Sequence, residues 1–394
     1  MVIEAAYIPR ALSTELLRQC EEFPVVTLLG PRQAGKTTLA RHSLPHYGYV
    51  SLETPHLRAH ASADPVAFLE AHPAPCIIDE IQRVPMLLSY IQGLVDEQGG
   101  SGHYVLTGSH HLALHEAVSQ SLAGRTSILT LLPLSLHELR NAGLTPVDAA
   151  TAIFTGFLPR VHSGPQRPTI AYSSYLRTYV ERDVRQLIRL KDVSLFEKFL
   201  RLLAGRVGQL VDYHSLGGDV GVDGKTIAHW LSILEASFVA FRLPPYFENF
   251  GKRLVKTPKI YFTDTGLLCH LLGIETPTQV ARDPLIGHLF ENLVVIECLK
   301  ARHHAAKDPN LYFFRDRHGL ELDLLHATGR QLIGLEIKSA STYHPTLCAA
   351  LERFHATVAP LARRTLVYSG EALHRSDDLD VIPYDAVAEF LLGE

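Results

Sequence analysis

The chain has 394 residues, of which 46% are hydrophobic, so it is long enough for several domains with buried cores. Its formal net charge of −4 argues against bulk nucleic-acid binding, so any such role must rest on local basic patches. The five cysteines are odd in number and never adopt a C-x-x-C spacing, which argues for a reducing cytosol and against disulfides and a structural zinc site.

Membrane insertion and secretion are not expected from the sequence. No stretch has the uncharged apolar length that a transmembrane helix requires. The first residues, MVIEAAYIPRALSTELL, also lack the pattern of a signal peptide. Together with the cysteine usage, this predicts a cytoplasmic protein.

The first strong signal is a strand that runs into a glycine-rich turn. Residues 25–29, VVTLL, form a short apolar run with β-branched residues, which predicts a buried strand. The next residues have the spacing G-x-x-x-x-G-K-T of a phosphate-binding loop between a strand and a helix. We expect this loop to bind a nucleoside triphosphate, and its residues are Gly30, Pro31, Arg32, Gln33, Ala34, Gly35, Lys36, Thr37 and Thr38.

Each chemical group in this loop has an expected role. The backbone at Gly30 and Gly35 can approach the phosphates closely because these residues have no Cβ. Backbone N–H groups and the positive helix end then surround the phosphates. Lys36 is expected to contact the β- and γ-phosphates, and the hydroxyl of Thr37 is placed to ligate Mg²⁺.

A second buried strand, predicted over residues 76–82, ends in two adjacent carboxylates. We expect Asp79 to hold Mg²⁺, directly or through water. Glu80 is expected to orient and polarise the attacking water. Paired acids are common at strand ends. The phosphate-binding loop upstream is what makes this pair indicate a nucleotide site.

The remaining N-terminal elements alternate between helices and strands, as in an α/β fold. We expect helices over 14–23, 64–71, 87–98 and 112–122, and strands over 49–53, 103–107 and 127–132. Ser109 follows one of these strands, where a small polar residue can reach the γ-phosphate or the water; a plain turn residue is the alternative.

The order GPRQAGKT, IIDE, LTGS, SLAGR and LLPLSLHEL resembles that of AAA+ ATPases. More narrowly, it resembles a prokaryotic AAA-type family whose members join this core to an uncharacterised C-terminal domain. The resemblance implies ATP and Mg²⁺ as ligands and places Ser109 at a sensor position. It also places Arg125 where related ATPases carry an arginine finger that acts on a neighbouring subunit, which implies a homo-oligomer. The alternative for Arg125 is a helix-end arginine in solvent.

After residue 134 helical patterns dominate, and we interpret residues 134–192 as an AAA+ lid with helices over 135–142, 148–154 and 172–190. Residues 213–220 and 224–235 then have the spacing of a helix-turn-helix, and strands follow over 238–243 and 259–262. This is the order of a winged helix, which contacts either DNA or a protein partner. The basic residues expected to contact duplex phosphates are Lys252, Arg253, Lys256 and Lys259.

The last third of the chain predicts the order α-β-β-β-α-β, with helices over 287–300 and 346–355 and strands over 311–314, 320–325, 332–337 and 365–368. It resembles the restriction-endonuclease-like fold with its D…E-x-K signature. The resemblance implies that Asp323 and Glu336 bind a divalent metal, that Lys338 acts on the attacking water, and that Glu291 is the helix acid. The alternatives are a degenerate site and charges on solvated strand edges.

These patterns predict an α/β protein with four domains. They are an AAA+ P-loop core (1–133), a helical lid (134–192), a winged helix (193–275) and an endonuclease-like α/β domain (280–394). The predicted function is that of an ATP-hydrolysing motor or switch acting on DNA, including branched or damaged duplex. The alternative is a signalling ATPase of the STAND kind, whose C-terminal domains bind a protein partner.

Overall fold

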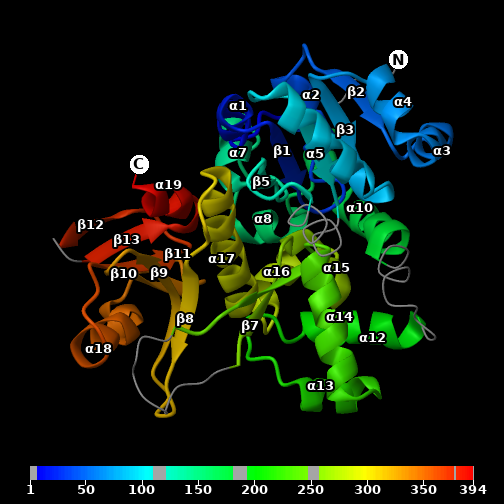
Figure 1. Ribbon diagram of the computed structural model, residues 1–394. Helices are drawn as coiled ribbons and strands as arrows, with labels where there is room; N and C mark the ends of the chain where they lie inside the picture. Colours follow the sequence, from blue (N-terminus) through cyan, green and yellow to red (C-terminus); the bar gives the residue numbers. More distant parts are fainter. Residues whose placement is uncertain (1–6, 110–120, 181–192, 247–256, 377–378, 394) are drawn as a thin grey trace. The chain divides into compact units, whose positions relative to one another are not determined.

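The computed structural model describes residues 7–109, 121–180, 193–246, 257–376 and 379–393 (Figure 1). The chain divides into two compact units, which are described separately. The first unit contains residues up to Leu134 with two short later segments, 236–238 and 303–307, and the second unit contains the rest. The main segment of the first unit therefore ends at Leu134, one residue beyond the predicted ATPase core.

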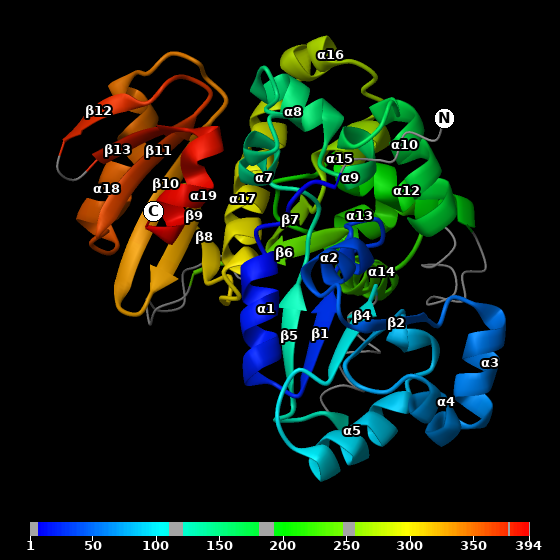
Figure 2. The same cartoon turned by 90° about the horizontal axis from the view of Figure 1, so that it is seen from above.

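The first unit is built on a five-stranded parallel sheet with the strand order β2-β3-β4-β1-β5. The strands are β1 (Val25–Leu29), β2 (Gly48–Ser51), β3 (Cys76–Asp79), β4 (Tyr104–Gly108) and β5 (Thr126–Thr130). Val25 of β1 is paired with Tyr104 on one side and Thr126 on the other. Figure 2 shows β5, β1 and β4 side by side with a common direction. All five residues of β1 are buried because the strand has neighbours at both edges and helices on both faces.

Helices cover both faces of this sheet. They are α1 (Ser13–Glu22), α2 (Lys36–Ser43), α3 (Pro55–Ala63), α4 (Pro65–Ala71) and α5 (Leu87–Gln98), with a 3₁₀ turn η1 (Ile81–Arg83) after β3. Alternate residues of β1 face opposite sides: Val26 and Leu28 belong to one buried cluster, with residues of α1 and α2. The flanking Val25 and Leu29 belong to another, with residues of α4 and α5. The result is a three-layer α/β/α arrangement.

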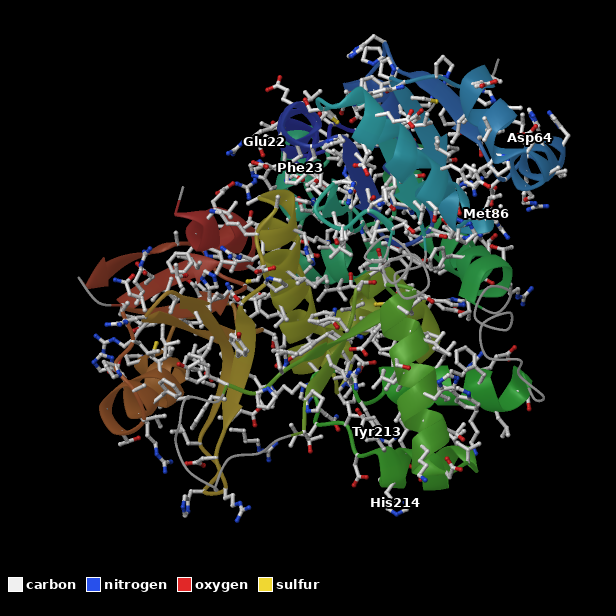
Figure 3. All side chains as sticks on the ribbon, in the orientation of Figure 1. Glu22, Phe23, Asp64, Met86, Tyr213 and His214 are labelled. Carbon is white, nitrogen blue, oxygen red and sulfur yellow. The ribbon has the colours of Figure 1, made fainter. Side chains whose placement is uncertain are left out.

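The local signals for these helices differ in strength. The predicted range 87–98 coincides with α5. Helix α4 begins at Pro65, and its cap is Asp64, whose carboxylate accepts a hydrogen bond of 3.0 Å from the N–H of Ala67 (Figure 3). Helix α3 was not predicted.

The phosphate-binding loop leaves β1 through a position that only glycine can occupy. Gly30 has a φ of 151°, and a Cβ there would lie 2.0 Å from the carbonyl oxygen of Leu131. Gly35, with a φ of 90°, is the left-handed residue at which α2 begins. The two glycines of the motif are therefore required by the close approach of β5 and by the turn into the helix.

Helices form most of the second unit before its C-terminal sheet. They are α7 (Leu136–Asn141), α8 (Ala149–Thr155), α9 (Pro159–His162), α10 (Pro168–Tyr175), α12 (Val193–Ala204), α13 (Tyr213–Val220), α14 (Gly224–Ala236), α15 (Thr265–Leu272), α16 (Pro277–Arg282) and α17 (Ile286–His304). The prediction of one helix over 172–190 is wrong at its start, because α10 begins earlier, at Pro168, whose ring is favourable in a first turn. It then changes to a π-helix over Leu176–Val180, and residues 181–192 lie outside the described part of the chain. None of the described helices is long and apolar enough to cross a membrane.

The predicted helix-turn-helix ranges agree with α13 and α14. Helix α13 is capped by Asp212 and ends at Gly221, which has a φ of 98°. Asp223 caps α14 by accepting a hydrogen bond of 2.6 Å from the N–H of Thr226. The strands β6 (Ala240–Leu243) and β7 (Lys259–Phe262) form an antiparallel pair after these helices. The predicted phosphate contacts Lys252, Arg253 and Lys256 lie outside the described residues.

The C-terminal part of the second unit is a six-stranded sheet with the order β12-β13-β11-β10-β9-β8. Its strands are β8 (Leu311–Arg315), β9 (Glu321–Thr328), β10 (Gln331–Lys338), β11 (Arg363–Tyr368), β12 (Leu373–Ser376) and β13 (Leu379–Pro383), and its later helices are α18 (Ala349–Thr357) and α19 (Val387–Leu392). Strand β10 runs antiparallel to β9 and parallel to β11. Leu351 and Phe354 of α18 belong to the same buried cluster as residues of these strands. The predicted α-β-β-β-α-β order is present, and β12 and β13 extend the sheet beyond it.

Candidate functional site

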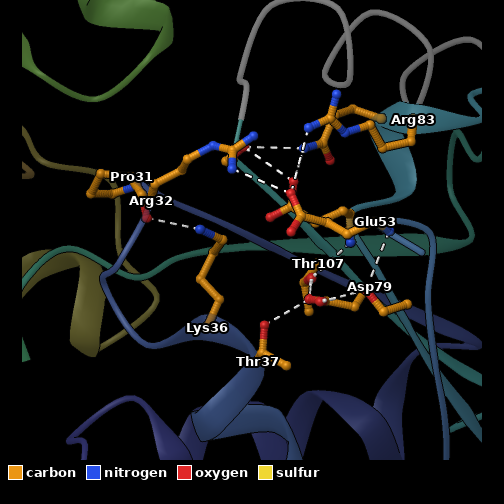
Figure 4. Close-up of polar contacts among 12 residues, drawn as sticks. Pro31, Arg32, Lys36, Thr37, Glu53, Asp79, Arg83 and Thr107 are labelled. Atoms are coloured by element: carbon orange, nitrogen blue, oxygen red, sulfur yellow. Dashed lines mark hydrogen bonds and ion pairs between the residues drawn. The ribbon is translucent and has the colours of Figure 1, made fainter. Parts of the chain in front are cut away.

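The phosphate-binding loop lies at the carboxyl edge of the parallel sheet, where ligands bind in open α/β folds. The Lys36 ammonium is buried and donates hydrogen bonds of 2.9 and 2.8 Å to the carbonyl oxygens of Gly30 and Pro31 (Figure 4). Burial lowers the pKa of Lys36 to about 8, although Glu80 and Asp79 act in the opposite direction. The ammonium is thus held inside the loop. When a phosphate binds there, its oxygens can accept the hydrogen bonds that the two carbonyl oxygens now accept.

The carboxylate of Asp79 accepts hydrogen bonds from four hydroxyl groups. Thr37 at the start of α2 donates to Oδ1 at 2.7 Å, and Thr107 of β4 donates to the same oxygen. Tyr49 and Ser51 of β2 donate to Oδ2 at 3.2 and 3.3 Å. Figure 4 shows Thr37 and Thr107 pointing toward Asp79 from opposite sides. The strand pairing of β2, β3 and β4 therefore fixes the position of this carboxylate.

The donor set at this point fits Mg²⁺. The ion prefers hard oxygen ligands, and the Thr37 hydroxyl and the Asp79 carboxylate lie 2.7 Å apart at the edge of the loop. These two residues would hold Mg²⁺, which in a triphosphate site neutralises charge on the β- and γ-phosphate oxygens.

Glu80 follows Asp79 with a backbone conformation that is rare for a residue with a side chain, at φ 59° and ψ 44°. Its carboxylate oxygen Oε2 accepts a hydrogen bond from the Gln82 amide and lies 3.4 Å from the Ser109 hydroxyl. Gln82 also donates to Ser109 at 3.1 Å. Burial raises the pKa of Glu80, while Lys36 and Arg32 act to lower it. The structure thus brings the predicted base and the predicted sensor into contact.

Arg125 lies at the opposite edge of the same sheet. It directly precedes β5, and its carbonyl oxygen accepts a hydrogen bond of 3.2 Å from the N–H of Val25, at the start of β1. Its guanidinium binds both oxygens of Asp96, at 2.5 and 2.9 Å. The phosphate-binding loop follows the other end of β1, so Arg125 cannot reach the nucleotide site of its own chain.

A separate group of charged residues lies in the second unit. Leu335 of β10 is paired with Leu324 of β9, so Glu336 and Asp323 are the next residues along the two strands. The Lys338 ammonium contacts both carboxylates, at 2.6 Å from Glu336 Oε1 and 3.3 Å from Asp323 Oδ2. The pairing predicted from sequence therefore brings these three residues together, with the lysine between the acids.

Lys259 of β7 and Glu291 of α17 extend this group. The Lys259 ammonium lies 2.9 Å from Glu291 Oε1 and 2.6 Å from Glu321 Oε1. Glu291 Oε1 also accepts a hydrogen bond of 2.5 Å from the Tyr261 hydroxyl. The prediction that Lys259 contacts DNA is wrong, because only 2% of this residue is exposed. Its charge is neutralised inside the protein by carboxylates from α17 and β9.

In the described structure, these acids are paired with lysine side chains. Within the described ranges, no three histidine, cysteine, aspartate or glutamate side chains are placed so that they could share an ion. Burial acts to raise the pKa of Glu291, but Lys259, His288 and Tyr261 together lower it to about 2. Burial and Asp323 raise the pKa of Glu336 to about 8 despite Lys338. The metal site predicted from Glu291, Asp323 and Glu336 therefore stays a prediction, and among the described residues two lysines supply positive charge to these acids.

Three family matches cover most of the chain. Residues 22–140 match a family described as an AAA domain. Residues 147–278 and 286–387 match two domains of unknown function, DUF8612 and DUF4143. An uncharacterized protein of Mycobacterium tuberculosis is 34% identical over 385 residues, which cover 96% of this chain and 84% of the relative. A Mycobacterium bovis protein gives the same values.

The chain belongs to the same family as these mycobacterial proteins, and it carries an AAA domain over residues 22–140. Among solved structures, a Walker-type ATPase of Pyrococcus abyssi is similar over 67% of this chain and 96% of its own length, with 16% identity and a TM-score of 0.44. The match of residues 22–140 to the AAA family model confirms the AAA domain predicted from sequence.

Several site residues of this AAA-domain protein were not predicted from its sequence. Arg10, before α1, is buried and donates hydrogen bonds of 2.5 Å to the carbonyl of Ala34 and 2.7 Å to that of Leu132. Arg10 therefore links the phosphate-binding loop to the segment that follows β5. Thr107 and Gln82 hold the two acids after β3, as described above. A lone arginine or threonine gives no periodic signal, whereas Gln82, two residues after Glu80, lay within the predicted strand.

Replacement of Lys259 by Met should destabilise this AAA-domain protein strongly. The substitution keeps the apolar stem but leaves the buried Glu291 carboxylate without its main counter-charge. Loss of one partner of a buried pair typically costs about 3–5 kcal/mol. The free energy of unfolding in urea at neutral pH measures the effect.

The exposed Lys225 provides the matched control, since Lys225→Met should change stability by less than about 0.5 kcal/mol. The double variant Lys259→Met with Glu291→Gln should recover part of the loss, because the unpaired charge is gone. Equal stability of Lys259→Met and the parent protein would contradict this account of the cluster.

Proposed function

We propose that the chain binds and hydrolyses ATP in the first unit and uses this reaction as a switch. The observation that carries the proposal is the convergence of Lys36, Thr37, Asp79 and Glu80 at the carboxyl edge of one parallel sheet, within an AAA domain. Each group has the chemistry that one part of the reaction requires.

The proposed mechanism assigns one task to each residue. Lys36 exchanges its carbonyl contacts for phosphate oxygens, and the N-terminus of α2 adds backbone donors. Thr37 and Asp79 would hold Mg²⁺. Glu80 orients the water and accepts its proton, and the raised pKa of its carboxyl makes it a stronger base. Gln82 and Ser109 hold the Glu80 carboxylate in place.

Two substitutions should separate binding from hydrolysis. Lys36→Ala should abolish nucleotide binding, because the ammonium contacts phosphate before any reaction occurs. Glu80→Gln should still bind ATP but hydrolyse it about 10²–10⁴-fold more slowly, because the amide cannot accept the proton. Calorimetric titration with MgATP and phosphate release measure the two effects. Hydrolysis by Glu80→Gln at the parental rate would show that Glu80 is not the base.

Oligomer formation belongs to the same proposal. Arg125 lies at the sheet edge opposite its own phosphate-binding loop, so a role in hydrolysis requires the nucleotide site of another subunit. A guanidinium suits this role because its planar donors match a phosphoryl group. In the free chain, Asp96 keeps the guanidinium at the surface.

Arg125→Ala should leave ATP affinity nearly unchanged and reduce turnover by about 10³–10⁵-fold, the range for a finger supplied by a neighbour. The specific activity of the parent protein should also rise with protein concentration. Asp96→Ala, which removes the partner but keeps the arginine, serves as the matched control and should retain activity. Turnover that is independent of concentration in a strict monomer would exclude the role.

We further propose that the switch acts on DNA through the helix pair α13 and α14. The supporting observation is the capped helix-turn-helix followed by the antiparallel pair β6 and β7, with Lys225 exposed in the first turn of α14. His214 also projects from the first turn of α13 (Figure 3). Lys252, Arg253 and Lys256 remain part of this proposal. Because Lys338 and Lys259 neutralise the acids of the second unit, we propose recognition rather than cleavage for the C-terminal sheet.

Lys225→Glu should weaken binding to short DNA duplexes of every sequence to a similar extent. A lost phosphate contact should reduce the slope of log K against log salt by about one. Fluorescence anisotropy at several salt concentrations measures both effects, and Lys307→Glu is a control at another exposed lysine. Absence of DNA binding by the parent protein at low salt would instead favour the signalling ATPase of the STAND kind with a protein partner.

A further inference from the structure

Two arginines beside the nucleotide site share one carboxylate oxygen. Oε1 of Glu53 lies 3.3 Å from Nη1 of Arg32 and 3.5 Å from Nη2 of Arg83. Figure 4 shows both guanidinium groups directed toward Glu53 from different parts of the chain. The proposed mechanism does not use Glu53, Arg83 or the side chain of Arg32.

All three residues lie at the edge of the sheet that carries the phosphate-binding loop. Arg32 is the third residue of the loop motif, Glu53 follows β2 by two residues, and Arg83 ends the turn η1 after Glu80. Their charges act on the site itself, since Arg32 and Glu53 influence the ionisation of Glu80 in opposite directions. Arg32 and Glu53 are therefore close enough to influence Glu80, the residue proposed to orient the attacking water.

The contacts with Glu53 are weak for arginine–carboxylate pairs. Charge-assisted hydrogen bonds of this kind are usually near 2.7–2.9 Å and often bidentate. Arg125 and Asp96, in the same unit, form such a bidentate pair at 2.5 and 2.9 Å. In contrast, the two arginines compete for a single oxygen of a carboxylate whose side chain is 50% exposed. Glu53 therefore holds both guanidinium groups only loosely.

Arg83 has unused hydrogen-bonding capacity. Its side chain is 26% exposed, and its Nε is buried without a hydrogen-bond partner in the part of the chain that the structure describes. An arginine has five N–H donors, and a buried donor without a partner costs free energy. A ligand with several acceptor oxygens would satisfy these donors better than one shared carboxylate oxygen.

We propose that Arg32 and Arg83 leave Glu53 when a nucleoside triphosphate binds and contact its terminal phosphate, so that the chain itself distinguishes triphosphate from diphosphate. The proposal rests on the nucleotide site proposed above. A γ-phosphate offers three oxygens that match the donors of two guanidinium groups, whereas a diphosphate lacks this group. In the nucleotide-free site, the Glu53 carboxylate then occupies the place that the γ-phosphate takes beside the two arginines.

This arrangement predicts opposite effects for the arginine and its partner. Arg83→Ala should reduce the affinity for the triphosphate analogue AMP-PNP with Mg²⁺ by about tenfold, the effect of one charged hydrogen bond. Its affinity for ADP should be unchanged, which also shows that the variant is folded. Glu53→Gln should increase AMP-PNP affinity and leave ADP affinity unchanged, because it removes the competing charge. Arg18→Ala, at an exposed ion pair on α1, is the matched control and should change neither affinity.

Calorimetric titration of the full chain measures all of these affinities. Equal losses for AMP-PNP and ADP in Arg83→Ala, or no loss, would overturn the proposal while leaving the nucleotide site intact. A decrease in AMP-PNP affinity for Glu53→Gln would also overturn it, because a purely structural ion pair predicts losses from either partner. Failure of the parent protein to bind either nucleotide would instead overturn the proposed function itself, and this inference with it.

Discussion

The geometry of the nucleotide site depends most on the hydrogen bonds that the Asp79 carboxylate accepts. Four hydroxyl groups from α2, β2 and β4 bind it, so one side chain connects the phosphate-binding loop with three neighbouring strands. This is possible because all strands are parallel and their carboxyl ends meet at the same edge. The strand register therefore sets the geometry of the site, and any shift of β2 or β4 would change the position of this carboxylate.

The two units treat buried negative charge in opposite ways. In the first, Asp79 is surrounded by neutral hydroxyl groups, which leave its negative charge available for a cation. In the second, Lys259 and Lys338 neutralise the acids directly. Local sequence cannot distinguish Asp79 from Glu336, since each is an acid near the end of an apolar strand. The difference arises from which distant residues fold against each acid.

Local patterns predicted much of the fold. The strand–loop–helix around Gly30, the full extent of α5, and the two helices on either side of Gly221 follow from residue spacing and caps. Long-range contacts could not be predicted in this way. Lys259 looked like a hairpin residue facing solvent because no local pattern shows that α17 places Glu291 against it. The position of Arg125 at the end of the sheet opposite the phosphate-binding loop likewise follows from the parallel pairing of β5 with β1.

The hydrogen bonds of Arg10 have a practical consequence for work on the isolated ATPase domain. The AAA match begins at residue 22, whereas Arg10 and most of α1 come before it. A fragment cut at the limits of the match would remove the guanidinium that holds the carbonyls of Ala34 and Leu132. It would also remove Leu12, Leu16 and Cys20 from one face of the sheet. The smallest folding unit of this domain is therefore larger than the region recognised by sequence similarity.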